Sequence, residues 1–245
     1  MIFQIPNLFE QLLALLRRWD FYLSGLLTTL WLYGWALLIG FFLGLMLAIL
    51  RQYGGMIFSR IATGYIEIIR GTPLLAQLLL LYFLPYAMGL PIGTWALKVS
   101  LTNRTSFIFL NHGILIAILT LGLNSAAYQA EYLRGAIVSV GSEQLIAAQS
   151  LGMSRLAGIR RVVLPQALRR VIPAWSNEAS YLPKYTVVVY FVGVLDLFGQ
   201  AYSLGFATFA VIPSYIIIAI IYLILISLIS KGLDTLYKRI AIPGL

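Results

Sequence analysis

The sequence predicts an all-α integral membrane protein, and three observations support this fold class. Of its 245 residues, 61% are hydrophobic and only 10% are charged. The mean hydropathy is +0.92. Long apolar stretches carry no charged residue at all, whereas a water-soluble domain needs charged side chains at roughly a quarter of its positions. The main solvent of this chain is therefore lipid.

The charge-free stretches locate the membrane spans, because a helix needs about 20 apolar residues to cross the hydrocarbon core. We predict spans over residues 21–50, 65–88, 111–133 and 213–230. A further apolar stretch, residues 171–195, contains Glu178 and Lys184 and is interrupted by Pro173 and Pro183. We interpret this stretch as a broken fifth span.

The basic residues orient the spans, since cytoplasmic loops of membrane proteins are enriched in Lys and Arg. Five spans place the two termini on opposite sides of the membrane. One side receives Arg51, Arg60, Arg134, Arg155, Arg160, Arg161, Arg169, Arg170, Lys231, Lys238 and Arg239. The other side receives only Arg17, Arg18, Lys98 and Arg104. We therefore predict a multi-pass plasma membrane protein with an external N-terminus and a cytoplasmic C-terminus.

The regions outside the spans are short. Residues 1–20 carry charges of both signs and no small-residue cleavage site, so we predict an external amphipathic lead-in and not a signal peptide. The loop over residues 89–111, rich in Pro, Gly, Ser and Thr, is the sizeable external feature. No internal repeat or linker is visible, so residues 21–240 are predicted to form a single transmembrane domain.

The composition argues against several classes of function. With no Cys and only His112, which we interpret as structural, the sequence indicates no disulfide framework and no metal site. It has no Gly-x-x-x-x-Gly-Lys-Ser/Thr phosphate loop and no nucleophile with a credible base, so we predict neither an enzyme nor a bound cofactor. The net charge of +9 is spread between apolar runs, which does not indicate a nucleic acid partner.

The connection over residues 141–165 carries the most specific signal. It is too charged to cross a membrane, and Ser142 followed by Glu143 is a plausible helix start. Gly152 interrupts this helix, and the Leu164-Pro165 pair is expected to end the loop where the next span begins. These features fit either an amphipathic helix on anionic lipid or a helix that docks in a groove of a cytoplasmic partner.

Six positions of this connection resemble the EAA loop of ABC importer permeases. That loop reads Glu-Ala-Ala, three residues, Gly, nine residues and Ile-x-Leu-Pro, and the matching positions are Ala147, Ala148, Gly152, Val162, Leu164 and Pro165. Ile146 stands at the Glu position, although the acidic Glu143 is close by, and Val162 stands at the Ile position. The resemblance implies that these six residues couple the chain to an ATPase.

Two further segments resemble permeases for polar amino acids, the group that handles histidine, glutamate, glutamine, arginine and opines. They are residues 70–77, which begin Arg-Gly-Thr-Pro, and residues 125–135, which lead into the EAA-like loop. The resemblance covers about residues 21–238 and departs from the family at residues 185–187, which read Tyr-Thr-Val. It implies a type I importer transmembrane domain with a MetI-like five-span core and a cytoplasmic coupling helix.

The same resemblance implies a set of partners. These are a second copy of the chain or a homologous permease, two cytoplasmic ABC ATPase subunits that bind ATP and magnesium, an extracytoplasmic solute-binding protein, an amino acid substrate and membrane lipid. ATPase-driven switching of the paired cores between inward and outward states would then translocate the amino acid.

Ionisable residues within spans indicate candidate transport residues, because a charge in lipid is costly. Glu67, Arg70 and Glu131 lie toward the predicted cytoplasmic ends, where ion pairing or snorkelling accounts for them. Glu178 lies inside the broken stretch, where an interrupted helix can line a water-filled cavity. We interpret it either as a contact for a substrate amino group or as the buried partner of Lys184.

Three further residues complete the predicted substrate pathway. Asn177 neighbours Glu178, and Asn124 and Tyr128 lie one turn apart on the span over residues 111–133. Gly40 and Gly44, one turn apart on the first span, are interpreted as sites of close helix packing, as is Gly34.

Three other functions compete with an importer permease. A secondary transporter or channel that needs no ATPase would show dense intramembrane charge or an inverted repeat, and a membrane enzyme would show a cluster of His, Asp or Glu. The sequence shows none of these features. A scaffold would use the loop over residues 141–165 to bind lipid, and association with an ATPase separates that possibility from a coupling loop.

Overall fold

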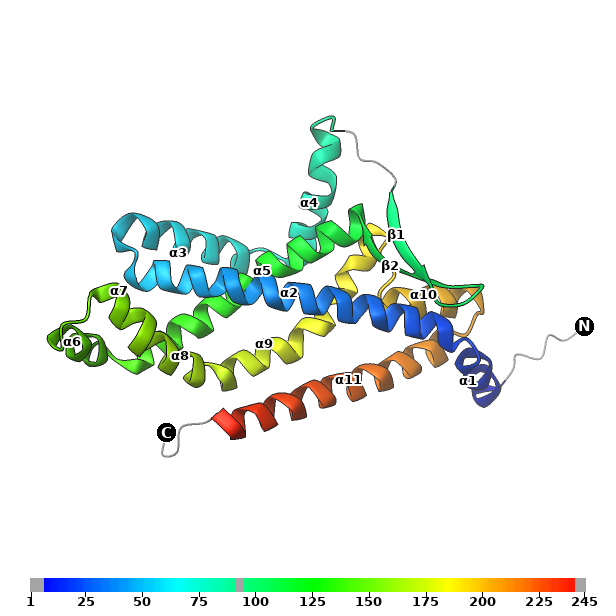
Figure 1. The fold of residues 1–245 in the computed structure, drawn as a ribbon. Coiled ribbons are helices and arrows are strands. Elements are labelled where there is room, and N and C mark those ends of the chain that lie inside the picture. Colours follow the sequence, from blue (N-terminus) through cyan, green and yellow to red (C-terminus); the bar gives the residue numbers. More distant parts are fainter. Residues whose placement is uncertain (1–6, 91–94, 241–245) are drawn as a thin grey trace, which may run out of the picture. The chain divides into compact units, whose positions relative to one another are not determined.

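The computed structural model describes residues 7–90 and 95–240, and these residues are mostly helical (Figure 1), which confirms the predicted fold class. The elements are α1 (Leu8–Leu16), α2 (Trp19–Tyr53), α3 (Gly55–Gly71), α4 (Leu74–Ala87), β1 (Ala96–Ser100), β2 (Ser106–Asn111), α5 (His112–Val140), α6 (Ser142–Ser150), α7 (Arg155–Gly158), the π-helical turn η1 (Ile159–Val163), α8 (Leu164–Arg170), α9 (Ile172–Tyr185), the 3-10 helix η2 (Thr186–Val192), α10 (Leu197–Ala207) and α11 (Val211–Ile240).

Three helices among the described residues are long and apolar enough to cross a membrane: Trp19–Tyr53, His112–Val140 and Val211–Arg239. Two bent pairs, α3 with α4 and the helices on either side of Gly193, raise the number of possible spans to five if each pair is one span. The predicted five-span topology and its orientation stay predictions.

The span predicted over residues 65–88 is not one helix. The chain leaves the α conformation at Thr72, which has φ −116° and ψ 144°, and α4 begins directly after Pro73. A proline ring disfavours the α conformation of the residue before it and removes a backbone donor. The Arg-Gly-Thr-Pro motif therefore marks a helix break.

The break in the stretch over residues 171–195 also differs from the prediction. Pro173 lies in the first turn of α9, where a missing N–H group is tolerated, and Pro183 lies inside α9, whose helical path continues into η2. The helix ends at Gly193 instead, in a left-handed conformation with φ +75°. Asp196 then caps α10, because its Oδ1 accepts the Gly199 N–H at 2.9 Å.

The loop over residues 89–111, predicted to be external, contains an element that was not predicted from the sequence. Strands β1 and β2 form an antiparallel hairpin, with Ala96 paired to Asn111 at one end and Ser100 to Ser106 at the other. The hairpin is fastened to α2, since Trp31 Nε1 donates to the Phe109 carbonyl at 2.7 Å. Residues 91–94 of this loop lie outside the described residues.

The predicted lead-in forms a short helix. Its residues 1–6 lie outside the described residues, and α1 follows with a capping box in which Asn7 and Glu10 satisfy each other's backbone N–H groups. Leu15 is buried while Leu8, Phe9, Leu13 and Leu16 are exposed. The amphipathic lead-in over residues 1–20 and its external location stay predictions.

The structure divides into two compact units. The first unit comprises Met1–Trp35, Pro73–Leu121 and Pro183–Ser227, and the second comprises Ala36–Thr72, Gly122–Leu182 and Leu228–Leu245. Helices α2, α5, α9 and α11 contribute residues to both units. A core around Leu197 and Ile217 stabilises the first unit, and a core around Leu133 and Val163 stabilises the second.

Candidate functional site

The EAA-like residues belong to a helical hairpin in the second unit. One arm of this helical hairpin is α6, and the other arm is the continuous helical segment of α7, η1 and α8. Helix α6 starts at Ser142, as predicted, and α6 and α7 lie side by side (Figure 1). Gly152 connects them in a left-handed conformation with φ +84°. Its N–H donates to the Gln149 carbonyl at 2.9 Å, and the Met153 N–H donates to the Ala148 carbonyl at 3.1 Å. The backbone therefore favours glycine at position 152, because a residue with a Cβ atom is strained in this left-handed conformation.

Small residues hold the two arms of this hairpin together. Ala148 is buried, and a Cβ atom on Gly158 would lie 2.8 Å from Leu145 Cδ1 and 3.4 Å from Ala148 Cβ. The two helices thus approach so closely that only short side chains fit at the contact. Ala147, the other alanine of the motif, is exposed.

The Leu-Pro end of the motif differs from the prediction. Leu164 and Pro165 do not end a loop, because α7, η1 and α8 follow one another without interruption from Arg155 to Arg170. The Leu164 N–H donates to the Ile159 carbonyl, which gives a wider π-helical turn just before the proline. Proline cannot donate a helix bond and its ring presses on the carbonyl four residues earlier, so the wider turn lets the helix continue.

The base of the hairpin is built into the core of the second unit. Val163 and Ala167 are buried in the same apolar cluster as Ile137 and Val140 of α5. Leu164 packs against this cluster, whereas Val162 is half-buried and Pro165 is exposed. A displacement of the hairpin must therefore act on α5, since close-packed interiors transmit strain.

The tip of the hairpin is apolar and basic. Leu151 and Leu156 are 84% and 75% exposed. Ile146, at the position where the family motif has Glu, is also exposed, and so are Arg155 and Arg160. Apolar side chains clustered with basic ones outside the longest apolar helices indicate a docking surface.

A series of hydrogen-bonded, buried polar groups joins helices α5 and α9 within the second unit. Trp175 Nε1 donates to Gln129 Oε1 at 2.7 Å, Gln129 Nε2 donates to Ser125 Oγ at 3.0 Å, and Ser125 Oγ donates to Glu178 Oε1 at 2.7 Å. Gln129 and Ser125 are fully buried, and Glu178 is 3% exposed. Glu178 was predicted from the sequence as a candidate, whereas its hydrogen-bond partner Ser125 and the groups that continue from it, Gln129 and Trp175, were not.

Glycines on α2 make room for this buried polar chain. A Cβ atom on Gly40 would collide with Gln129 Nε2 and would lie 2.9 Å from Ser125 Oγ. A Cβ atom on Gly44 would lie 3.0 Å from the Ala126 carbonyl oxygen. Close helix packing is thus confirmed for Gly40 and Gly44, but it is wrong for Gly34, whose Cβ position has no neighbour within 4 Å.

The other predicted pathway residues have different environments. Asn124 is buried on α5, and Asn177 is exposed on α9. Tyr128 is half-buried, with the Arg70 guanidinium 5.2 Å from the centre of its ring. Lys184 lies on the last turn of α9 with an exposed side chain, in the other unit from Glu178, so the pairing of these two residues stays a prediction.

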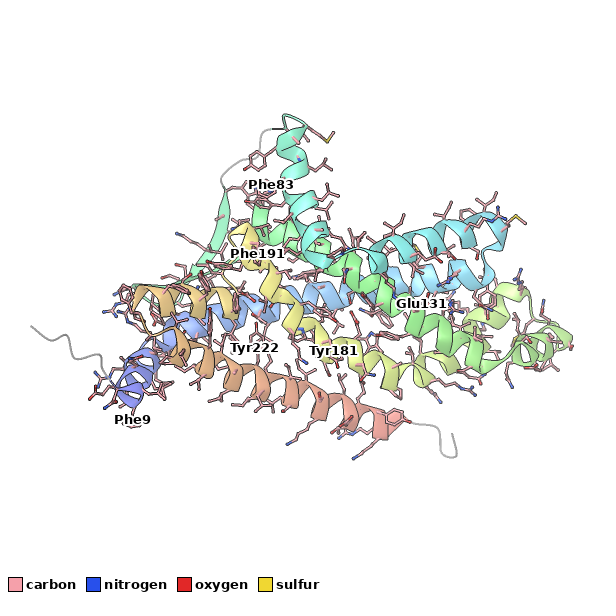
Figure 2. The ribbon with its side chains drawn as sticks, turned by 180° about the vertical axis from the view of Figure 1, so that it is seen from behind. Phe9, Phe83, Glu131, Tyr181, Phe191 and Tyr222 are labelled. Atoms are coloured by element: carbon pink, nitrogen blue, oxygen red, sulfur yellow. The ribbon has the colours of Figure 1, made fainter. Side chains whose placement is uncertain are left out.

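Glu131 on α5, labelled in Figure 2, is surrounded by three arginines from three helices. Arg134 Nη2 lies 3.0 Å from Glu131 Oε2, Arg70 Nη1 lies 3.8 Å from Oε1, and Arg51 donates to Oε1. Ion pairing was the prediction for Glu131 and Arg70, and it is confirmed. The single carboxylate ties the ends of α2, α3 and α5 together.

Replacing Glu131 by glutamine should lower the free energy of unfolding by about 1–3 kcal/mol, because a neutral amide leaves three neighbouring guanidinium groups without a counter-charge. The thermal unfolding midpoint of the purified chain measures this loss. Glu67→Gln is a matched control, since Glu67 is an exposed glutamate on α3. Equal midpoints for the two variants would contradict a stabilising role for Glu131.

Comparison with known proteins places these features in a wider group. Residues 40–241 match the family described as binding-protein-dependent transport system inner membrane component. The chain is 34% identical over 209 residues to the nopaline transport system permease protein NocM of Agrobacterium fabrum, which covers 85% of this chain and 83% of NocM. It is 32% identical over 220 residues to the glutamine transport system permease protein GlnP of Escherichia coli, covering 90% of this chain and 93% of GlnP.

A solved structure extends the similarity to the fold. The crystal structure of an amino acid ABC transporter with histidines has a TM-score of 0.78 to this chain at 33% identity. The match covers 93% of this chain and 97% of the other. The arrangement of helices is therefore similar to that of an ABC transporter transmembrane subunit over almost the full length.

Proposed function

The chain belongs to the family of binding-protein-dependent transport system inner membrane components, and we propose that it carries a polar amino acid inward, driven by separate ATPase subunits. Its relatives are permease subunits of amino acid and opine transporters, so the chain is a transport component and not an enzyme. The observation that carries this function is the family match over residues 40–241, which includes the entire helical hairpin.

The working complex that we propose contains several chains. The permease pairs with a second copy or a homologous permease, and two ATPases that bind ATP and magnesium dock on its cytoplasmic side. A solute-binding protein delivers the amino acid from the external side. The clustering of basic residues on the hairpin supports a cytoplasmic location for it and for the C-terminus, with the N-terminus outside.

Coupling in this proposal passes through the hairpin. Its exposed tip at Leu151 and Leu156 inserts into a groove of the ATPase, while its base is packed against α5. When the ATPases close on ATP, they move the hairpin as a rigid body, and α5 moves with it. The binding protein favours the outward state only because it binds that state more tightly.

Glu178 is the proposed substrate contact among the buried polar groups. Its Oε1 accepts the hydrogen bond from Ser125, which leaves Oε2 available to a substrate amino group. The buried location makes the carboxylate costly unless a cation compensates for it. A substrate ammonium group would supply this compensation during transport.

Glu178→Gln should lower the maximal rate of uptake at least tenfold, because the amide keeps the side-chain shape and an acceptor for Ser125 but removes the charge. Ser125→Ala is the matched control, since it removes the hydrogen bond and leaves the carboxylate in place. Initial rates of labelled amino acid uptake into proteoliposomes measure the effect. If Ser125→Ala reduces uptake as much as Glu178→Gln, Glu178 has only a structural role.

The proposed function is tested by reconstitution. The chain is placed in liposomes with its ATPase and binding protein, and uptake of labelled arginine, histidine, glutamine and glutamate is measured with and without ATP. Uptake of at least one of these that requires ATP is the expected result. Uptake that proceeds without ATP would instead favour a secondary transporter or a channel.

A further inference from the structure

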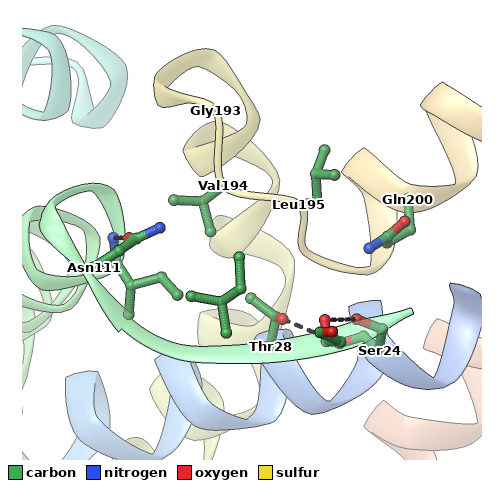
Figure 3. A pocket seen from close by; sticks show the side chains of 10 residues that line it. Ser24, Thr28, Asn111, Gly193, Val194, Leu195 and Gln200 are labelled. Atoms are coloured by element: carbon green, nitrogen blue, oxygen red, sulfur yellow. Dashed lines mark hydrogen bonds between the residues drawn. The ribbon is translucent and has the colours of Figure 1, made fainter. Parts of the chain in front are cut away.

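Two cavities in the first unit adjoin one another at the helix break after η2. Both are lined by Asn111, Gly193 and Val194. The smaller has a volume of about 130 Å³ and a largely apolar wall that also carries hydroxyl and amide groups (Figure 3), for which we name it the polar cavity. The larger has a volume of about 440 Å³ and is named the aromatic cavity for the three aromatic residues Tyr82, Tyr86 and Trp95 in its wall. Interrupted helices in membrane proteins are tolerated where they line cavities, and in transporters they build binding sites.

The polar cavity offers neutral hydrogen-bonding groups. Ser24 Oγ donates to the Ser106 carbonyl at 3.1 Å and Thr28 Oγ1 donates to the Ser24 carbonyl at 3.0 Å, so the lone pairs of both hydroxyl groups remain as acceptors. Asn111 Oδ1 accepts the Ile114 N–H at 2.7 Å, which leaves its amide NH₂ group as a donor. Acceptors and donors within one small cavity match the ammonium and carboxylate groups of an amino acid.

Gln200 adds a second amide to the polar cavity. Its side chain extends from α10 toward this cavity (Figure 3). The backbone N–H groups of Gly193 and Val194 are not available as donors, because they donate to the Tyr190 and Val189 carbonyls. The side-chain amides of Asn111 and Gln200 are donors that this cavity presents to a ligand carboxylate.

The aromatic cavity suits an extended cation. Tyr82, Tyr86 and Trp95 line it, and the ring centre of Tyr82 lies 5.2 Å from that of His112. Aromatic faces attract ammonium and guanidinium groups. His112 lines this cavity, and its Nε2 atom is buried and makes no hydrogen bond within residues 7–90 and 95–240.

We propose that the two cavities form one binding site for an amino acid with a cationic side chain. The head group lies in the polar cavity, and the side chain lies against the aromatic rings. Among the described residues that line the two cavities, none is Asp, Glu, Lys or Arg, so an acidic side chain would lose its hydration without gaining a counter-charge.

This site differs from the Glu178 site in position and in role. It belongs to the first unit, beside the β1–β2 hairpin, whereas Glu178 belongs to the second unit. The inference rests on the proposed function, whose topology places the β1–β2 hairpin on the external side. The site therefore receives the amino acid from the binding protein and selects for side-chain charge within the permease itself.

The test measures binding of labelled L-arginine, L-glutamine and L-glutamate to the permease–ATPase complex in nanodiscs, without the binding protein. We expect the wild-type complex to bind arginine more tightly than glutamate. Tyr82→Leu should weaken arginine binding about tenfold, whereas Tyr82→Phe, which keeps an aromatic ring, should weaken it much less. Trp95→Leu is a second variant, because Trp95 is exposed and its replacement threatens folding less.

Two results would overturn the inference. One is a wild-type complex that binds arginine and glutamate equally or binds neither, and the other is wild-type affinity for arginine in both leucine variants. ATP-driven uptake by the complete wild-type importer is measured in parallel. If one of these two binding results is found and ATP-driven uptake is still observed, the inference is wrong but the proposed function stands. If arginine binds as expected but no ATP-driven uptake is observed, the proposed function is wrong but the inferred binding site stands.

Discussion

Gly152→Asp is expected to abolish ATP-driven uptake while the chain still inserts and folds. Gly152 has φ +84°, and it is exposed with no neighbour within 4 Å of a Cβ position. The substitution therefore causes no clash, but a side chain in this conformation costs roughly 1–2 kcal/mol. The cost is relieved by reorienting α6 against α7, which displaces Leu151 from the docking geometry. Initial rates of uptake should fall at least a hundredfold.

Two further variants separate the possible causes. Gly152→Ala adds strain without charge and should also impair uptake, though less severely. Gly135→Asp introduces the same charge at an exposed glycine of α5 that also has no neighbour within 4 Å and has no positive φ, so uptake should stay close to wild type. Co-purification of the ATPase with each variant measures docking directly. Full ATPase association and full uptake in Gly152→Asp would contradict the coupling role of the hairpin.

Features that depend on local backbone chemistry could be predicted from the sequence. The turn at Gly152 follows from the conformational freedom of glycine. Helix α6 starts at Ser142, as predicted, although its N-cap is Gly141, which makes no side-chain cap hydrogen bond. The break at Thr72 carries a similar local signal, since it precedes Pro73, but the apolar run across residues 65–88 concealed it. An apolar run therefore locates a membrane-spanning stretch but does not show where its helix is interrupted.

Features that depend on distant partners could not be predicted. Gln129 and Trp175 are separated by 46 positions, and no spacing rule connects residues this far apart. The β1–β2 hairpin was missed because its strands are only five and six residues long and are held by pairing with each other and by contact with α2. Glu131 shows the intermediate case, since ion pairing near a helix end follows from the cost of charge in lipid, but the identity of its three arginines does not.

The second unit has a tightly packed, hydrogen-bonded interior and an exposed helical hairpin tip, and this arrangement suits the transmission of ATPase movement to the membrane helices. The hydrogen bonds that connect Trp175, Gln129, Ser125 and Glu178 join α5 and α9. Val163 joins the helical hairpin to α5 by apolar packing. The hairpin tip, with Leu151 and Leu156, exposes apolar side chains beyond this packed region. A force applied at the tip therefore reaches the helix that carries Ser125, the partner of Glu178.

Gly40→Leu should be the most destabilising single change in the second unit. A Cβ atom at this position already collides with Gln129 Nε2, and the rest of the leucine side chain would press further into α5. Gln129 cannot move aside without breaking its hydrogen bonds to Trp175, Ser125 and the Leu37 carbonyl. Overpacking and the loss of these bonds together should cost about 3–5 kcal/mol. The thermal unfolding midpoint should fall by roughly 10 °C.

Gly34→Leu provides the matched control, because it places the same residue on the same helix where a Cβ atom meets nothing within 4 Å. Its midpoint should stay within about 2 °C of wild type, since a leucine in open space causes no overpacking. The double variant Gly40→Leu with Gln129→Ala tests the cause, because removing the amide removes the clash. If overpacking at Gln129 is responsible, the second substitution should recover part of the lost stability. A double variant no more stable than Gly40→Leu alone would show that the Ser125 side chain, whose Oγ lies 2.9 Å from a Cβ atom at residue 40, and not the amide, limits the size of this residue.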